Sequence, residues 1–387
     1  MPSRVLILSA SVGGGHLRAA EAVELAIKEI APDVIVKNVD VLAYSNSFFR
    51  MLYRTGYFLL VNRAPALFGA LYDYMDRPRK HAPSFGDQTR ILFERINMRR
   101  FIKLLHEEAW DVIIHTHYLS AEITAALRRS GKFTVPHCII TTDFDTHRIW
   151  MAEPCEYYFT ENEEGALHLR CFGVSGERIK ATGVPIHPVF SKPLDRAACM
   201  AFQEIAGDRP VVLQLAGGFG LGPVEAMFNA LLSIETPIEL VVVAGRNEKA
   251  KRSLEAVKPP HRHKVKVIGF TSRIHELMAA ADIVVSKPGG LTVSEVLACG
   301  AALAVVNPIP GQESRNSDFL LENGAAVKIN NVATAAHKLE ALIRDRTRLE
   351  NIRRNAKRLG RPMAAFEVAR LAIDLAAACG DCQRNAL

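Results

Sequence analysis

The chain has 387 residues, of which 49% are hydrophobic and 23% are charged, a composition typical of a globular protein long enough for two domains. No run of about 18 apolar residues occurs and glycines interrupt the short apolar start, so we expect neither a membrane-spanning helix nor a secretory signal. The seven cysteines are odd in number and scattered, which favours reduced thiols in a cytoplasm. Cys379 and Cys382 form a C-x-x-C pair, but zinc needs two further ligands, so no structural metal is expected there.

The net charge of +7 is concentrated in one stretch. Residues 50–103 hold eleven Lys and Arg against four acidic residues, an excess equal to that of the whole chain. The same stretch carries nine of the 28 aromatic residues. We therefore predict a local basic and aromatic surface on an otherwise neutral protein.

Apolar runs alternate with helical patterns along the whole chain. The first half has strand patterns at residues 5–8, 34–39, 112–115, 137–141, 157–160 and 179–182. The basic, aromatic stretch is an insertion between the second and third of these, at residues 48–103. A second series follows, at residues 211–216, 238–244, 265–270, 282–286, 301–306 and 325–329.

Two successive series of this kind predict an α/β fold with two Rossmann-like, doubly wound parallel-sheet domains that face a central cleft. We assign the first domain to residues 1–186, a proline-rich linker to 187–208 and the second domain to 209–361. A C-terminal helix at 362–387 is expected to pack back on the first domain.

The first strand is followed by a glycine-rich turn, Gly13, Gly14 and Gly15, and then by His16 at the start of a helix. Such a turn lets a phosphate approach the backbone beside unpaired helix N–H groups, and His16 is aimed at the same crevice. One alternative is the NAD-binding loop of an NAD-dependent dehydrogenase, since Asp40 ends the next strand, but Arg18 stands where that motif requires its third glycine. A tight turn without a ligand is the other alternative.

Three loops of the second half also follow strands. Residues 215–222 form another glycine turn. Residues 286–300 place Gly289 and Gly290 at a helix start and Glu295 in its second turn, where a carboxylate can accept from a ribose diol. Residues 307–316 set Gln312 and Glu313 at the head of a further helix, with groups suited to sugar hydroxyls. Because all these loops lie at strand ends, we expect them to form a binding site together.

The ordered set of motifs resembles one family over nearly the full length. The motifs are GGGH (13–16), TTDFDTHRIW (141–150), TGVPIHPVF (182–190), GGFG (217–220), SKPGGLTVSE (286–295) and PGQE (310–313). They are similar to those of the monogalactosyldiacylglycerol synthase and processive diacylglycerol glucosyltransferase family. These are GT-B glycosyltransferases related to the peptidoglycan N-acetylglucosaminyltransferase. The resemblance implies inverting transfer of a hexose, galactose or glucose, from a UDP-sugar to diacylglycerol.

The resemblance also implies roles for particular residues. His16 is the general base that removes the acceptor proton, with a pKa expected near neutral, and Asp143 orients His16 or the acceptor. The backbone at Gly217–Gly220 and Gly290–Thr292 holds the diphosphate, and Phe270 contacts uracil through its main chain. Glu295 binds the ribose, and Gln312 and Glu313 contact the sugar. The donor-binding set is Gly14, Gly15, Gly217, Gly218, Phe219, Gly220, Arg246, Phe270, Gly289, Gly290, Leu291, Thr292, Glu295, Gly311, Gln312 and Glu313.

Several smaller features refine this hypothesis. Asp143 and Asp145 form a D-x-D pair, but the glycine loops already serve the phosphates, so no metal or other cofactor is expected. The Glu-x7-Glu pattern of many retaining enzymes is absent, because the residue eight positions after Glu295 is Leu303. This absence favours inversion. His115 and His117 end a strand of the first domain, and either a contact with the acceptor or a structural role fits them.

The insertion predicts contact with an anionic membrane. On a helical wheel Phe48, Leu52 and Leu59 share one side, with Arg50 and Arg54 opposite, as in an interfacial helix. We therefore expect a cytoplasmic protein attached peripherally to the inner face of the cell membrane; a solvated amphipathic helix is the alternative. A nucleic-acid-binding protein would use the same stretch but leaves the second domain's loops unexplained. Within the glycosyltransferase class, an isoprenoid-linked acceptor remains the second hypothesis.

Overall fold

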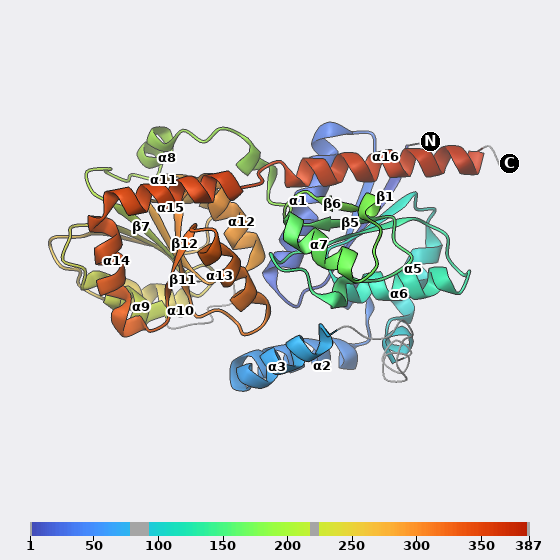
Figure 1. Ribbon diagram of the computed structural model, residues 1–387, viewed down its shortest axis with the longest axis horizontal. Helices are drawn as coiled ribbons and strands as arrows, with labels where there is room; N and C mark the ends of the chain where they lie inside the picture. Colours follow the sequence, from blue (N-terminus) through green and yellow to red (C-terminus); the bar gives the residue numbers. More distant parts are fainter. Residues whose placement is uncertain (1, 78–92, 217–223, 385–387) are drawn as a thin grey trace. The chain divides into compact units, whose positions relative to one another are not determined.

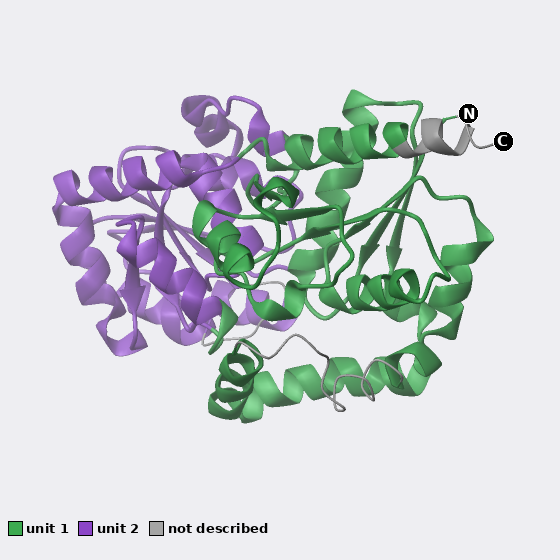
Figure 2. Ribbon diagram, turned by 45° about the vertical axis from the view of Figure 1, so that its right-hand side comes forward, with its two compact units in different colours: residues 1–188, 309–312, 362–387 green, residues 189–308, 313–361 purple. Residues whose placement is uncertain are grey.

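Alternating strands and helices produce two parallel six-stranded sheets in the computed structural model (Figure 1). The structure describes residues 2–77, 93–216 and 224–384, and side chains as far as residue 378. Two compact units result: Met1–Pro188, Ile309–Gln312 and Pro362–Leu387 form unit 1, and Val189–Pro308 and Glu313–Arg361 form unit 2 (Figure 2). All twelve predicted strands form, and the predicted α/β class is confirmed.

The sheet of unit 1 has the order β2-β1-β3-β4-β5-β6, with every pair parallel. Its strands are β1 (Arg4–Ser9), β2 (Ile35–Asp40), β3 (Val112–His115), β4 (His137–Ile140), β5 (Tyr157–Thr160) and β6 (Ile179–Ala181). The chain moves outward from β1 to β2 and then returns to the other side of β1 with β3. The strand order therefore reverses between β1 and β3, and ligands of such sheets bind at this reversal, beyond the carboxyl ends of the strands.

Helices cover both faces of this sheet. They are α1 (Gly14–Ile30), α5 (Arg99–Glu107), α6 (Tyr118–Arg129), α7 (Glu163–Cys171) and α16 (Ala364–Arg384), with short 3₁₀ turns at Val41–Tyr44, Arg148–Trp150 and Gly176–Arg178. On one face α1 and α16 lie side by side over Val5, Ile7 and Ile114 (Figure 1). On the other, α5 and α6 pack against Leu6, Leu8 and Ile113. Strands buried on both faces explain the continuous apolar runs in the sequence.

Two helices of the insertion, α2 (Ser47–Arg63) and α3 (Pro65–Met75), belong to unit 1. The buried side chains of Phe49 and Tyr72 pack α2 and α3 against the rest of unit 1, while large apolar side chains remain exposed on both helices. The exposed set is Phe48, Met51, Leu52 and Leu59 of α2 and Leu67, Leu71, Tyr74 and Met75 of α3, called below the α2–α3 apolar surface. Among the described residues, no helix is long and apolar enough to cross a membrane.

Unit 2 repeats the architecture with the order β12-β11-β10-β7-β8-β9. Its strands are β7 (Val211–Leu215), β8 (Glu239–Val243), β9 (Lys264–Ile268), β10 (Ile283–Ser286), β11 (Ala302–Val306) and β12 (Ala326–Ile329). Its helices are α8 (Arg196–Phe202), α9 (Val224–Leu232), α10 (Glu248–Glu255), α11 (Ile274–Ala280), α12 (Gly290–Cys299), α13 (Gln312–Glu322), α14 (Ala335–Arg344) and α15 (Arg346–Leu359), with 3₁₀ turns at Pro188–Ser191 and Val332–Thr334. Here the order reverses between β7 and β10, so the segments after these strands reach the ligand-binding edge.

Candidate active site

His16 lies at the reversal point of the unit 1 sheet. It occupies the first turn of α1, just beyond β1, and Gly13 serves as the N-cap with an extended backbone (φ −148°, ψ 163°). A Cβ atom added at Gly13 or Gly14 would meet nothing within 4 Å. The helix start therefore presents open space and N–H groups beside His16, as the glycine turn predicts.

The hydrogen bonds of His16 define its tautomer. Nδ1 lies 2.8 Å from the backbone carbonyl oxygen of Thr116, which follows β3 and is 100 residues away in sequence. Since a carbonyl only accepts, Nδ1 carries the proton and Nε2 keeps a lone pair. Thr142 Oγ1 lies 3.2 Å from the same Nδ1, and Thr116 Oγ1 donates to the His16 carbonyl at 3.0 Å. The ring is thus oriented by residues after β3 and β4.

Burial governs the protonation of this ring. It lowers the pKa of His16 to about 4, although the hydrogen bond to Thr116 opposes the shift. The expectation of a pKa near neutral is therefore corrected, because the sequence did not reveal how deeply the ring sits among its neighbours. At neutral pH the imidazole is uncharged, the form that a general base requires.

Aromatic rings pack around His16. His117 meets it edge-on at 4.8 Å between ring centroids, and Trp150 lies at 6.1 Å. His117 stacks on Tyr118 at 4.4 Å, and Tyr118 OH lies 2.6 Å from the OH of Tyr53 on α2. His117 also caps α6, because its Nδ1 accepts from Leu119 N at 3.2 Å. Burial, and then the neighbouring His16, hold the pKa of His117 well below its usual value.

The two histidines of HTHYLS occupy different places. His115 is completely buried, and its Nδ1 lies 2.8 Å from Ser120 Oγ. Its ring meets that of His137 at 5.1 Å, and burial holds the pKa of His115 well below its usual value. His117 is the one that contacts His16.

Asp143 directly follows Thr142, the residue that contacts His16, and is half-buried. Its neighbour Asp145 lies 3.5 Å from His168 Nδ1 on α7. Within the described part of the chain, no group of three His, Cys, Asp or Glu side chains could hold a metal ion. Cys379 and Cys382 fall beyond the described side chains.

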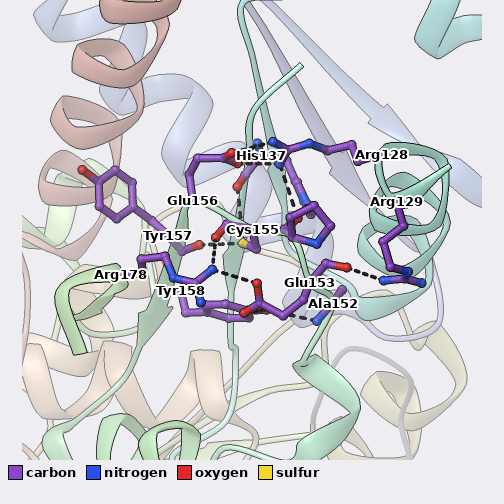
Figure 3. Close-up of polar contacts among 11 residues, drawn as sticks. Arg128, Arg129, His137, Ala152, Glu153, Cys155, Glu156, Tyr157, Tyr158 and Arg178 are labelled. Atoms are coloured by element: carbon purple, nitrogen blue, oxygen red, sulfur yellow. Dashed lines mark hydrogen bonds and ion pairs between the residues drawn. The ribbon is translucent and has the colours of Figure 1, made fainter. Parts of the chain in front are cut away.

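A partly buried polar network fixes the chain between this segment and β5 (Figure 3). Tyr158 OH accepts from Ala152 N at 3.1 Å and donates to Glu153 at 3.3 Å, and Arg178 donates to Glu153 at 2.7 Å. Arg128 holds Glu156 with two hydrogen bonds, of 2.7 and 2.6 Å. Burial opposes the charge of Glu156, but the bonds from Arg128 and from the His137 backbone hold its pKa below the usual value. The network anchors the segment that ends in Trp150.

In unit 2 the start of α12 lies at the reversal point, after β10. Gly289 is its N-cap and makes no side-chain capping bond, and the first turn holds Gly290, Leu291 and Thr292. Unpaired N–H groups at a helix start carry positive potential and suit a phosphate. The glycine loop after β7, which contains Gly217, Gly218, Phe219 and Gly220, lies outside the described residues.

The start of α13 adds polar groups at the same edge. A Cβ atom added at Gly289 would lie 3.7 Å from Glu313 Oε1, and Asn316 Nδ2 donates to the Pro288 carbonyl at 3.0 Å. Glu295 is buried in the second turn of α12. Gly311 has φ +86°, and Gln312 Nε2 donates to Tyr57 OH at 3.4 Å, a contact within unit 1.

Arg246 and Phe270 come together beyond β8 and β9. The Arg246 guanidinium lies 4.9 Å from the ring centroid of Phe270, whose side chain is 66% exposed. An exposed cation–aromatic pair offers both a flat face and a charge.

Sequence reasoning missed Thr116, Thr142, Trp150 and the pair Tyr53–Tyr118. One signal was available for the threonines: both lie within two residues of a strand end, and carboxyl ends of parallel strands share one edge. Nothing in the sequence indicated that Tyr53 of the insertion meets Tyr118.

Two family models match the chain. The family described as "Monogalactosyldiacylglycerol (MGDG) synthase" matches residues 16–186, and "Glycosyl transferases group 1" matches residues 224–359. Residues 16–186 belong to the monogalactosyldiacylglycerol synthase family, and the chain as a whole has the GT-B fold. It is a glycosyltransferase.

Relatives in this family match over nearly their whole length. The processive diacylglycerol beta-glucosyltransferase of Bacillus licheniformis is 27% identical over 357 residues, 92% of this chain and 90% of that protein. The Bacillus subtilis enzyme of the same name is 27% identical over 358 residues, 92% and 91% of the two chains. Among solved structures, MurG of Acinetobacter baumannii has a TM-score of 0.62 at 19% identity, covering 96% of this chain and 100% of MurG, which confirms the fold.

Proposed function

We propose that this family member transfers a hexose from UDP-glucose or UDP-galactose to the free hydroxyl of diacylglycerol, with inversion. The observation that carries the proposal is the tautomer of His16: the Thr116 carbonyl holds the proton on Nδ1 and leaves Nε2 as the base. The activity for which the Bacillus relatives are named supports the acceptor. The structure of Anabaena HepE with UDP-glucose, at 14% identity and a TM-score of 0.55, supports a fold able to hold such a donor.

The reaction then needs one displacement. The acceptor oxygen attacks the anomeric carbon, the bond from that carbon to the diphosphate breaks, and UDP leaves with the electron pair. The hydroxyl proton passes to His16 Nε2. A base with a pKa of about 4 accepts it because the hydroxyl becomes strongly acidic as its oxygen bonds to carbon. A single displacement inverts the anomeric configuration.

Unit 2 supplies most of the donor-binding groups in this proposal, and Gln312 belongs to unit 1. The N–H groups of Gly290, Leu291 and Thr292 face the charge that develops on the diphosphate, together with the loop of Gly217–Gly220. Phe270 and Arg246 bind the uracil, and Glu295 binds the ribose. Gln312 and Glu313 bind the sugar. Gly14 leaves room at the helix start, Gly15 directly precedes His16, and Asp143 follows Thr142 in the segment after β4.

The α2–α3 apolar surface supports a site of action at the membrane. Diacylglycerol stays in the bilayer, so the enzyme must approach the lipid surface. Exposed Phe48, Leu52 and Leu59 would enter the interfacial region, with the cationic Arg50 and Arg54 near anionic head groups. This is the peripheral attachment expected from the sequence.

One experiment tests the proposal. Purified protein is incubated with diacylglycerol vesicles and labelled UDP-glucose, UDP-galactose or UDP-glucuronate, and the lipids are separated. We expect labelled glycolipid from one hexose donor, with a β-linkage by NMR, since both donors carry an α-linked sugar. Transfer only to an isoprenoid-linked acceptor, or an α-linked product, would contradict it.

A further inference from the structure

The segment between β4 and β5 brings two groups to His16. Thr142 Oγ1 lies 3.2 Å from His16 Nδ1, and the Trp150 ring lies 6.1 Å from the imidazole. Displacement of this segment would alter both the orientation and the burial of the base. What holds the segment therefore bears on the reaction.

The C-terminal end of α3 holds it directly. Asp76, which caps α3 and has a side chain only 10% exposed, accepts from the backbone N–H of Arg148 through Oδ1 at 2.8 Å. His147 is completely buried, and its Nε2 lies 2.9 Å from the carbonyl of Tyr72, in the last turn of α3. His147 Nδ1 accepts from Ile149 N at 2.9 Å, so Nε2 carries the proton and donates to Tyr72.

A second element reinforces the connection. His168 of α7 lies between two carboxylates, with Nε2 4.0 Å from Asp76 Oδ1 and Nδ1 3.5 Å from Asp145 Oδ1. The His147 ring also packs against that of Tyr72 at 4.1 Å. The end of α3 and the segment after β4 thus share a largely buried polar contact, called below the α3 latch: Tyr72, Asp76, His147 and Arg148.

The same helix exposes part of the α2–α3 apolar surface. Leu67, Leu71, Tyr74 and Met75 are exposed on α3, only one or two turns from the latch. One short helix therefore carries both the surface proposed to meet the bilayer and the contacts that hold the segment beside His16.

We propose that His147 and Asp76 are positioning residues that fasten the Thr142–Trp150 segment to α3, so that seating α3 on a membrane raises turnover at His16. The inference rests on the proposed function, because it requires the α2–α3 apolar surface to bind lipid. It assigns to the insertion a role in catalysis as well as in membrane attachment.

The test uses a water-soluble short-chain diacylglycerol as acceptor, with and without phospholipid vesicles that contain no substrate. We expect the parent enzyme to gain several-fold in kcat when vesicles are added. Asp76→Ala and His147→Ala should lose this gain and fall in kcat by ~10-fold or more, since small misplacements of reacting groups are costly. Vesicle binding by sedimentation and the Kd for UDP should stay within about two-fold of the parent.

Two further variants separate positioning from general stability. His147→Gln keeps an N–H donor for the Tyr72 carbonyl and should recover much of the gain. Asp345→Ala removes a comparable bond, in which Asp345 Oδ1 accepts from Arg348 N at 2.9 Å in unit 2, and should leave the vesicle effect intact. In His147→Ala, looser packing should expose His16 and raise its pKa, so the fall of kcat/KM on the acidic side should occur at a higher pH. The titratable ring packed on His16 is that of His117.

The outcomes are distinct. A parent enzyme that binds vesicles without a gain in kcat, or latch variants that keep the gain, would overturn the inference while leaving the proposed reaction in place. Failure of the parent to bind vesicles would instead contradict the membrane part of the proposed function. If His147→Ala does not fold, Asp76→Ala provides the same test at a less buried position.

Discussion

The two units carry their candidate functional groups at equivalent points of similar sheets. Unit 1 uses side chains at this point, whereas unit 2 uses mainly backbone groups. In unit 1 the reversal point carries buried side chains, with His16 held by Thr116 and Thr142 and enclosed by His117 and Trp150. In unit 2 the equivalent point carries the start of α12, where backbone N–H groups and glycines predominate. Proton transfer needs one atom at a defined place, whereas a diphosphate is bound well by a diffuse positive potential.

The difference predicts unequal sensitivity to side-chain removal. Changes in the unit 1 site should act on kcat, and changes in the unit 2 site on donor affinity. The following expectations test this contrast, from the largest effect to the smallest.

Replacement of His16 by Ala should have the greatest effect. Loss of a positioned general base lowers kcat by ~10²–10⁴-fold, and the Kd for UDP should change little because no donor group is removed. Steady-state kinetics and UDP titration measure the two quantities. His106→Ala, an exposed histidine of α5, is the matched control. Unchanged kcat in His16→Ala would remove His16 from the mechanism.

Substitutions in the α2–α3 apolar surface should have the second-largest effect. Leu52→Asp combined with Leu59→Asp removes two side chains that are 49% and 52% exposed, and each buried leucine contributes about 1.5–3 kcal/mol. We expect vesicle affinity to fall by ~10-fold or more, with UDP binding unchanged. Leu167→Asp on α7, also exposed, should bind vesicles like the parent. Equal binding by the double variant would identify α2 as an ordinary solvated helix.

Glu295→Ala should act on the donor side alone. Removal of a charged acceptor for the ribose diol is expected to raise the Kd for UDP by ~10-fold, since hydrogen bonds to charged groups contribute about 1.5–3 kcal/mol. Isothermal titration measures this, with Glu322→Ala at the exposed end of α13 as control. A fall in kcat with unchanged UDP affinity would reverse the contrast between the units.

The smallest expected effect is the dependence of thermal stability on pH. Burial lowers the pKa of both His16 and His137 to about 4, below the unfolded value near 6.5. Between these values the unfolded chain binds more protons, so stability is full above pH 6.5 and declines as the pH falls toward 4. Thermal unfolding across this window should show a falling Tm, of several degrees, for the transition of unit 1. A Tm that is constant over the window would mean that these rings are hydrated.

Much of the architecture was predictable because hydrophobic periodicity is a local property. All twelve strands form where apolar runs occur, and the glycine turn before His16 leads into a helix as expected. The placement of His16 and Gly289 just after strands was also predictable, because ligands of parallel sheets bind beyond the carboxyl ends of strands.

Only the tertiary structure decided how the groups around His16 meet. The contact of His16 with Thr116 spans 100 residues, and the contact with Thr142 spans 126. The latch between Asp76 and Arg148 spans 72. Sequence motifs pointed to Asp143, whereas the hydroxyl beside the imidazole belongs to Thr142. The pKa of about 4 likewise arises from burial, and the rings packed on His16 come from two separate segments, at His117 and Trp150. Local sequence determines where a strand ends and what residue follows it; which side chains then enclose one another depends on packing between distant segments, and that also determines the protonation of the base.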